Sequence, residues 1–194
     1  MKKAAIDDVE PDNLGTNSSH RKLSDAVETS ELTLNHYSLA PGEGFPGGLH
    51  AHMDQEEVFA ILEGEATFET MDGAVTVRKG EVIRFSPGEF QSGENESDEV
   101  LVALALGAPR ETSDIRIPAN CPECDHGDLR VNTDDAGIFF VCPSCNSKYV
   151  PRDCPHCNHA NLSITRKHGR TVTVCQKCES VFENPPSKIR YLRG

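Results

Sequence analysis

All eight cysteines of this chain fall into two frames with the same spacing. Each frame has the form C-x2-C-x17-C-x2-C, and the second repeats the first after 33 residues. Their members are Cys121, Cys124, Cys142 and Cys145 in the first frame and Cys154, Cys157, Cys175 and Cys178 in the second. Two thiolate pairs that a hairpin brings together supply the tetrahedral four-sulfur shell that zinc prefers. The sequence therefore predicts two structural Zn²⁺ ions.

Disulfides are the alternative use of an even number of cysteines. The N-terminus does not resemble a secretory signal, because Lys2 and Lys3 are followed by only three apolar residues before Asp7 and Asp8. The longest apolar run, residues 100–106, is too short to span a bilayer. We therefore expect a cytoplasmic protein with no membrane partner, in which cysteines at this spacing bind metal. The modules they define are two zinc ribbons, at residues 119–148 and 152–180.

A second set of metal-ligating side chains lies near the middle of the chain. His50 and His52 are two residues apart, so in a strand both imidazoles project from the same face. Glu57 is offset from them by an odd number of residues, so a turn at residues 53–55 must return it from the next strand. Two imidazoles and one carboxylate with open positions opposite suit Fe(II), Mn(II), Ni(II), Cu(II) or Zn(II). Glu56 is the rival carboxylate.

These residues belong to a longer pattern. Gly44, His50, His52, Glu57 and Gly64 follow one another at the intervals of a known family motif. The chain here resembles the first motif of the cupin superfamily, and the family's interval to Gly64 selects Glu57. The second motif is similar but departs at two points, and its members are Gly80, Ser86 where a proline is usual, Gly88, Gln91 where the family has its last histidine, and Asn95.

The resemblance covers about residues 30–110 and is nearest to small single-domain barrel proteins. It implies a jelly-roll barrel, or double-stranded β-helix, with one divalent metal inside. Gln91 is then either a fourth ligand or a residue that supports the ligands. Cupin relatives commonly dimerise by sheet-on-sheet contact, so the resemblance also implies a homodimer.

The elements around these residues are short strands separated by turns. Strand patterns occur at residues 32–39, 57–62, 66–70, 75–77, 82–85 and 100–106, with glycine-containing turns between most of them. Such spacing predicts an all-β fold with a barrel at residues 30–116. Residues 1–29 are polar without an apolar period, and we expect a flexible arm there. Residues 57–62 and 100–106 are apolar on both faces, so the outer face needs a cover, either a second copy or the ribbons.

Charge is divided unevenly along the chain. Residues 1–119 carry 23 acidic and 9 basic residues, whereas residues 120–194 carry 8 acidic and 10 basic residues. The acidic half excludes nucleic-acid binding by the barrel itself. The basic residues of the second ribbon and of the expected tail at 181–194 allow weak contact with nucleic acid or protein; they include Arg166, Lys167, Arg170, Lys188, Arg190 and Arg193. Four further histidines are expected at the surface and not as ligands, namely His126, His156, His159 and His168.

Two classes of function are consistent with these features. In the first, the barrel metal acts on or senses a small molecule; in the second, the barrel is a scaffold and the ribbons bind nucleic acid or protein. No general acid or nucleophile is evident beyond the ligands, so the sequence leaves open whether the protein is an enzyme. It names no substrate.

Overall fold

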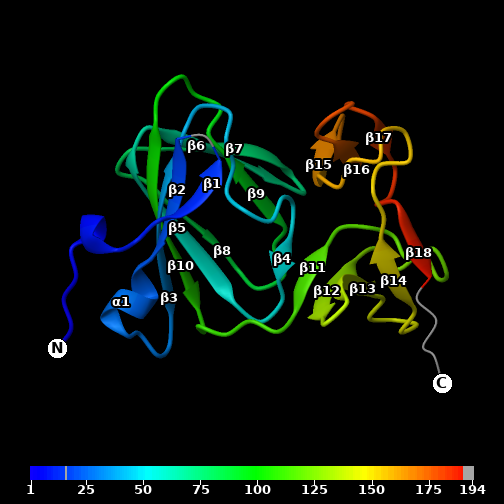
Figure 1. The fold of residues 1–194 in the computed structure, drawn as a ribbon, viewed down its shortest axis with the longest axis horizontal. Helices are drawn as coiled ribbons and strands as arrows, with labels where there is room; N and C mark the ends of the chain where they lie inside the picture. Colours follow the sequence, from blue (N-terminus) through cyan, green and yellow to red (C-terminus); the bar gives the residue numbers. More distant parts are fainter. Residues whose placement is uncertain (16, 190–194) are drawn as a thin grey trace. The chain divides into compact units, whose positions relative to one another are not determined.

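The computed structural model describes residues 1–15 and 17–189. The fold is almost entirely β, as predicted (Figure 1). The chain divides into two compact units. The first comprises Met1–Gly48 with His52–Ser113, and the second comprises Leu49–Ala51 with Asp114–Gly194. The predicted barrel boundary at residue 116 therefore lies a few residues inside the second unit. Among the described residues, no helix is long and apolar enough to cross a membrane.

The first unit is a jelly-roll barrel built from two antiparallel sheets. The larger sheet has the order β1-β2-β3-β10-β5-β8, and the smaller has the order β7-β6-β9. The strands of the larger sheet are β1 (Asp12–Gly15), β2 (Ser18–Lys22), β3 (Thr33–Leu39), β10 (Leu101–Ala108), β5 (Glu56–Glu63) and β8 (Val82–Phe85). Those of the smaller sheet are β7 (Gly73–Arg78), β6 (Glu65–Thr70) and β9 (Gln91–Glu94). All six strands predicted for the barrel are present.

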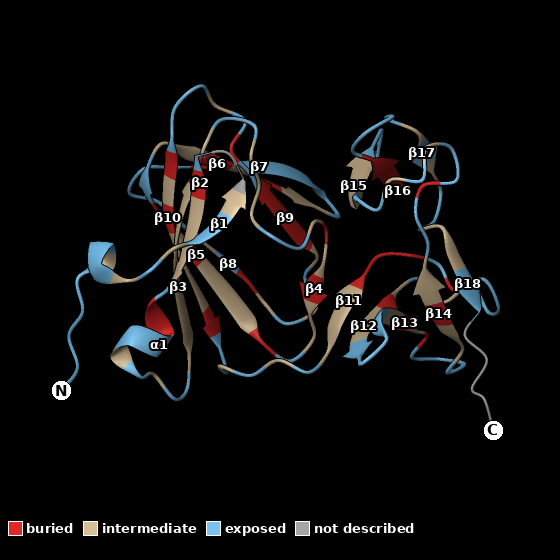
Figure 2. Cartoon of the chain, in the orientation of Figure 1, coloured by how far each residue is buried: buried red, intermediate tan, exposed pale blue. Residues whose placement is uncertain are grey.

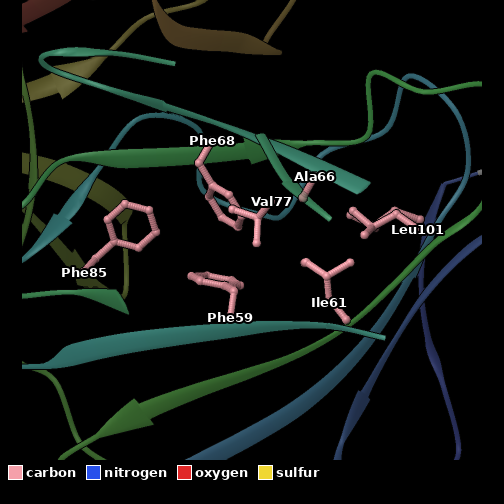
Figure 3. Close-up of a cluster of buried hydrophobic side chains, with 9 residues drawn as sticks. Phe59, Ile61, Ala66, Phe68, Val77, Phe85 and Leu101 are labelled. Carbon is pink, nitrogen blue, oxygen red and sulfur yellow. The ribbon is translucent and has the colours of Figure 1, made fainter. Parts of the chain in front are cut away.

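The barrel core fills the space between the two sheets with apolar side chains. Phe59 and Ile61 of β5 are buried, whereas Leu62 beside them is exposed, as expected for a strand with one face inward. Phe68 and Phe85 complete an aromatic cluster with Phe59, and their ring centroids lie 4.9–6.1 Å apart (Figure 3). Phe45 also lies against this cluster, while Phe90 is not part of it.

The turn between β5 and β6 requires glycine. Gly64 has a φ of 72°, and a Cβ there would lie 2.7 Å from the carbonyl oxygen of Val100. Both the left-handed backbone and the close approach exclude a side chain. The interval from Glu57 to Gly64 is thus the length of β5 up to its obligatory turn.

The N-terminal residues correct one prediction. Residues 12–15 form β1 and residues 18–27 form β2 and helix α1 (Leu23–Val27) instead of belonging to a flexible arm, and a 3-10 helix η1 (Ile6–Asp8) precedes them. β2 pairs with β3, with Ser19 opposite Ser38. Ser18 is buried although it is polar, and its hydroxyl accepts a hydrogen bond from the Ala40 N–H at 2.9 Å. Backbone pairing with the edge of an existing sheet therefore outweighs the polar composition of this segment.

The second unit contains the two ribbons. β11 (Ile115–Ile117), β12 (Leu129–Asp134), β13 (Gly137–Val141), β14 (Lys148–Pro151) and β18 (Ser187–Ile189) follow one another across one sheet. β15 (Leu162–Lys167), β16 (Arg170–Cys175) and β17 (Val181–Phe182) form a second sheet. The predicted hairpins are β12–β13 and β15–β16. Buried Tyr149, Phe140 and Leu129 form a small core with Cys121 and Cys142 of the first cysteine frame. Figure 2 shows that buried positions occur along the strands of this sheet.

The structure also corrects the prediction of a basic tail. β17 completes the sheet of the second ribbon, and β18 pairs with β14 of the first, with Lys188 opposite Val150. The Asn184 side chain accepts a hydrogen bond from the Asn120 N–H at 3.0 Å. Residues 181–189 are therefore part of the ribbon fold. Arg190 and Arg193 lie outside the described residues.

Candidate metal centres

The predicted histidine and glutamate ligands come together in the structure. His50, His52 and Glu57 each offer one ligand atom, and these atoms lie within 4.8 Å of one another. His52 ends the two-residue strand β4 (Ala51–His52), and Glu57 is the second residue of β5, so residues 53–55 turn the chain between them. This is the turn that the odd spacing requires. Three such ligands could hold a divalent metal.

Glu57 is the centre of this arrangement. Its Oε1 lies 3.5 Å from Nε2 of His52, and both side chains are mostly buried. Its Oε2 accepts a hydrogen bond from the amide nitrogen of Gln91 at 3.0 Å. An ionised carboxylate only accepts hydrogen bonds, so the nitrogen and not the oxygen of Gln91 faces Glu57.

The rival carboxylate points elsewhere. Oε2 of Glu56 accepts a hydrogen bond from the Arg84 guanidinium at 3.0 Å, and both side chains are largely exposed. Successive residues of a strand face opposite sides of the sheet, so only one of the two glutamates can reach the interior. That residue is Glu57.

A tyrosine that the sequence analysis did not single out lies near this site. Burial raises the pKa of Tyr37 to about 12, and the negative charge of Glu57 contributes to the same shift. Its ring stacks on His20 at 4.7 Å and meets Phe45 edge to face at 5.0 Å. Tyr37 is therefore a neutral hydroxyl at physiological pH. Its position in the strand pattern of residues 32–39 could have placed it inside the barrel, but nothing local connects it with Glu57.

The eight cysteines form two four-sulfur clusters, as predicted. In each frame the ligand atoms lie within 4.8 Å of one another, and all eight cysteines are free. Sulfur atoms in the first cluster are 3.6 Å apart across the pairs Cys121–Cys145 and Cys124–Cys142. A tetrahedron with zinc–sulfur bonds of about 2.3 Å has edges of about 3.8 Å. The spacing therefore fits zinc and not disulfides.

All four Cys-x2-Cys pairs form the same type of turn. In each, the N–H of the first cysteine donates to the carbonyl five residues later, and the carbonyl of that cysteine accepts from the N–H four residues later. The residue after the second cysteine is left-handed in all four turns, at Asp125, Asn146, Asn158 and Glu179. Hydrogen bonds with Ser147 lower the pKa of Cys145 to about 6, and those with Ser180 do the same for Cys178. These two turns thus favour a thiolate at their second cysteine, which is the form that binds metal, whereas burial raises the pKa of Cys142 and Cys157 to about 12.

No histidine joins a cysteine cluster among residues 1–15 and 17–189. His156 instead bonds the Ser180 hydroxyl at 2.8 Å, and His126 lies 3.5 Å from the Asp128 carboxylate. Both ribbons have complete shells of four cysteines without them.

Comparison with known proteins agrees with this description of the barrel. Residues 35–107 match the family model described as a cupin domain. The chain therefore contains a cupin domain, and His50, His52, Glu57 and Gln91 all lie within it. None of the curated proteins matches the chain.

Solved structures similar to the chain include two enzymes. One is a sugar phosphate isomerase from a cupin superfamily, from Silicibacter pomeroyi DSS-3, with 21% identity and a TM-score of 0.55 over 74% of this chain and 94% of that one. Another is the polyketide cyclase RemF from Streptomyces resistomycificus, with 21% identity and a TM-score of 0.53 over 63% of this chain and 89% of that one. Similarity at this level shows the fold alone.

Proposed function

We propose that the protein is a metal-binding cupin whose barrel holds one divalent ion on His50, His52 and Glu57. The observation that carries this proposal is the convergence of two imidazoles and one partly buried carboxylate within 4.8 Å. Three ligands on one side leave coordination positions open, which suits a catalytic or sensing site more than a structural one. Fe(II), Mn(II), Ni(II), Cu(II) and Zn(II) all accept this ligand set.

Gln91 supports the ligands in this proposal and is not itself a ligand. Its side chain is 3% exposed and its amide donates to Oε2 of Glu57. That bond fixes the carboxylate and leaves Oε1 directed toward His52. Residues that orient ligating carboxylates in this way are part of most metal sites.

The small molecule that we propose for this site is an oxygen donor, such as a carboxylate or a sugar. A bound divalent ion would act as a Lewis acid on an oxygen of that molecule. Tyr37 can donate a hydrogen bond or a proton to it, because the raised pKa keeps its hydroxyl neutral. Phe85 of the phenylalanine cluster lies opposite Glu57 in the pairing of β5 with β8, and we expect it to help exclude water from the site. One reaction to assay first is sugar phosphate isomerisation, the activity in the name of one similar structure. The reason for choosing it is the oxygen-donor chemistry that we propose for this site.

Metal analysis of matched glutamate variants tests the barrel site. Wild-type protein, incubated separately with each of the five ions, should retain one ion beyond the two ribbon zincs. Glu57→Gln and the double variant His50→Ala, His52→Ala should lose that ion, whereas Glu56→Gln should retain it, because Glu56 bonds Arg84. Circular dichroism checks the fold. A wild-type chain that never takes up a third ion would refute the site.

If the ion is found, the next measurement separates an enzyme from a sensor. Turnover of a small oxygen-donor molecule that disappears in Glu57→Gln identifies an enzyme. Binding without turnover, lost in the same variant, identifies a sensor.

We propose a second role for the second ribbon, as a weak contact site for a polyanion in the cytoplasm. The turn of β15–β16 exposes Lys167, His168 and Arg170, while Arg166 bonds the Gly169 carbonyl at 2.7 Å and holds the turn. His168 and Gly169 both have positive φ, which is the geometry of a tight two-residue hairpin. The turn therefore presents its cationic side chains on a rigid support.

Binding to single-stranded RNA at increasing salt tests this second role. Lys167→Glu and Arg170→Glu should each lower the log-log salt slope by roughly 0.7 per lost phosphate contact. Lys79→Glu, on the barrel, is the control and should leave the slope unchanged. Absence of binding at low salt would refute this role and leave protein contact or simple solubility as the function of the basic turn.

We also propose that the barrel forms a homodimer through the outer face of its larger sheet. On that face Ala60 of β5 lies between Val82 of β8 and Leu104 of β10. Val82, Val100 and Leu62 are 69%, 49% and 39% exposed. An apolar sheet face of this kind is stabilised by contact with a second copy.

A further inference from the structure

The hydroxyl group of Thr112 lies between the ring of His52 and the carboxylate of Asp54. Its oxygen is 3.2 Å from Nδ1 of His52 and 2.6 Å from Oδ1 of Asp54. Ser113 donates two further hydrogen bonds to Oδ2 of Asp54, from its N–H and its hydroxyl, both at 2.8 Å. Thr112 lies beyond residues 35–107, which match the cupin family model. The contact therefore reaches from the matched segment to a residue beyond it.

The direction of these hydrogen bonds follows from counting hydrogen atoms. Asp54 is exposed and receives three donors, which is the environment of an ionised carboxylate that only accepts. The single hydroxyl hydrogen of Thr112 therefore points to Asp54. Its oxygen is left to accept a hydrogen bond, and the group within reach is Nδ1–H of His52.

We propose that Thr112, held by Asp54, is a positioning residue that fixes His52 as its Nδ1–H tautomer. The lone pair of this imidazole is then on Nε2, which lies 3.5 Å from Oε1 of Glu57. A metal ion can bind where the lone pairs of these two atoms point into the same space. The other tautomer would carry a hydrogen on Nε2, which would hydrogen-bond Glu57 instead. The inference rests on the proposed metal site and names what prepares one of its ligands.

Metal affinity in four variants tests the proposal. The full chain, with zinc in both ribbons, is titrated with Mn(II) and separately with Ni(II), and free Mn(II) is followed by electron paramagnetic resonance. Thr112→Val keeps the shape and removes the hydroxyl, so binding should weaken about 10- to 100-fold. Thr112→Ser restores the hydroxyl and should bind nearly as wild type does. Ser113→Ala leaves the hydroxyl of Thr112 and its bond to Asp54 in place, and it should have little effect.

A spectroscopic measurement separates tautomer control from simple packing. In ¹⁵N NMR spectra of the protein with an empty barrel, the two ring nitrogens of a neutral histidine have very different shifts, and His52→Gln identifies the signals of His52. Wild type, Thr112→Ser and Ser113→Ala should show the Nδ1–H form, and Thr112→Val should lose that preference. An unchanged tautomer in Thr112→Val would overturn the proposal even if affinity fell, since the loss would then reflect packing. Failure of wild type to take up a third ion of any of the five would refute the metal site, while the tautomer measurement would still decide the role of Thr112.

Discussion

The side chains of the barrel site differ in how far their roles can be predicted from neighbouring residues. His50, His52 and Glu57 lie within eight residues, so strand periodicity for the two histidines and one short turn before Glu57 bring them together. The partners that orient them are distant in sequence. Gln91 is 34 residues from Glu57, and Thr112 is 60 residues from His52. Spacing predicts the ligands of this centre, whereas only the folded chain reveals their supports.

The amide of Gln91 gives the first prediction at this scale. Gln91→Leu removes the donor from Oε2 of Glu57, so the barrel should bind metal about 10- to 100-fold more weakly. Gln91→His places an imidazole where the second motif usually has one and should tighten binding. Titration with Ni(II) measures both. Equal affinity in wild type and Gln91→Leu would show that Glu57 needs no support from this residue.

A second prediction concerns the left-handed residue of the last cysteine turn. Asp and Asn occupy this position in three turns, but Glu179 occupies the fourth, with a φ of 58°. Asn tolerates left-handed backbone better than Glu, because its short side chain bonds the local backbone. Glu179→Asn should therefore raise the unfolding free energy of the second ribbon by up to about 1 kcal/mol.

Resistance of the ribbon zincs to a chelator measures this effect. Glu183→Asn removes the same charge from residue 183, which lacks a positive φ, so it is the control. Equal gains in both variants would attribute the effect to charge and not to the backbone.

The elements of the barrel follow the sequence pattern where apolar side chains alternate. β5, β6 and β10 each place large apolar residues on the inner face, and all were predicted within one or two residues. β4 has only two residues, and β9 reads Gln-Ser-Gly-Glu, so neither carries a period. β1 and β2 are polar as well, and their partners lie on a sheet edge that no local pattern identifies. Strands that exist because of backbone pairing alone are the ones that the sequence does not predict.

The third prediction concerns β18, which follows the second ribbon but pairs with the first. A chain that ends at Pro186 loses every pair between β18 and β14. The first ribbon should then release its zinc faster to a chelator, because the exposed edge of β14 frays. A chain that ends at Ile189 keeps all the described pairs and is the control. If both chains release zinc at the wild-type rate, the strand contributes nothing to the first ribbon.

At the scale of the whole molecule, the outer face of the barrel predicts the assembly. Wild-type protein should have twice the chain mass of 21.2 kDa by light scattering. Leu104→Lys places a charge at the centre of the apolar face and should produce a monomer, since burying an unpaired charge is costly. Val75→Lys alters an exposed valine of the other sheet, 42% exposed, and should leave the dimer intact. A wild-type monomer at micromolar concentration would contradict the proposed dimer.

The identical spacing of the two cysteine frames also affects how the unfolded chain acquires its zinc. Seventeen residues separate Cys124 from Cys142 in the native frame, whereas only eight separate Cys145 from Cys154, which belongs to the other frame. Closing the shorter loop costs about 0.7 kcal/mol less in chain entropy. A newly made chain therefore favours a misloaded intermediate, in which one ion bridges the two ribbons and must be released before either can fold. Metal-induced refolding should accordingly show a slow exchange phase, which Cys142→Ser removes together with the first zinc.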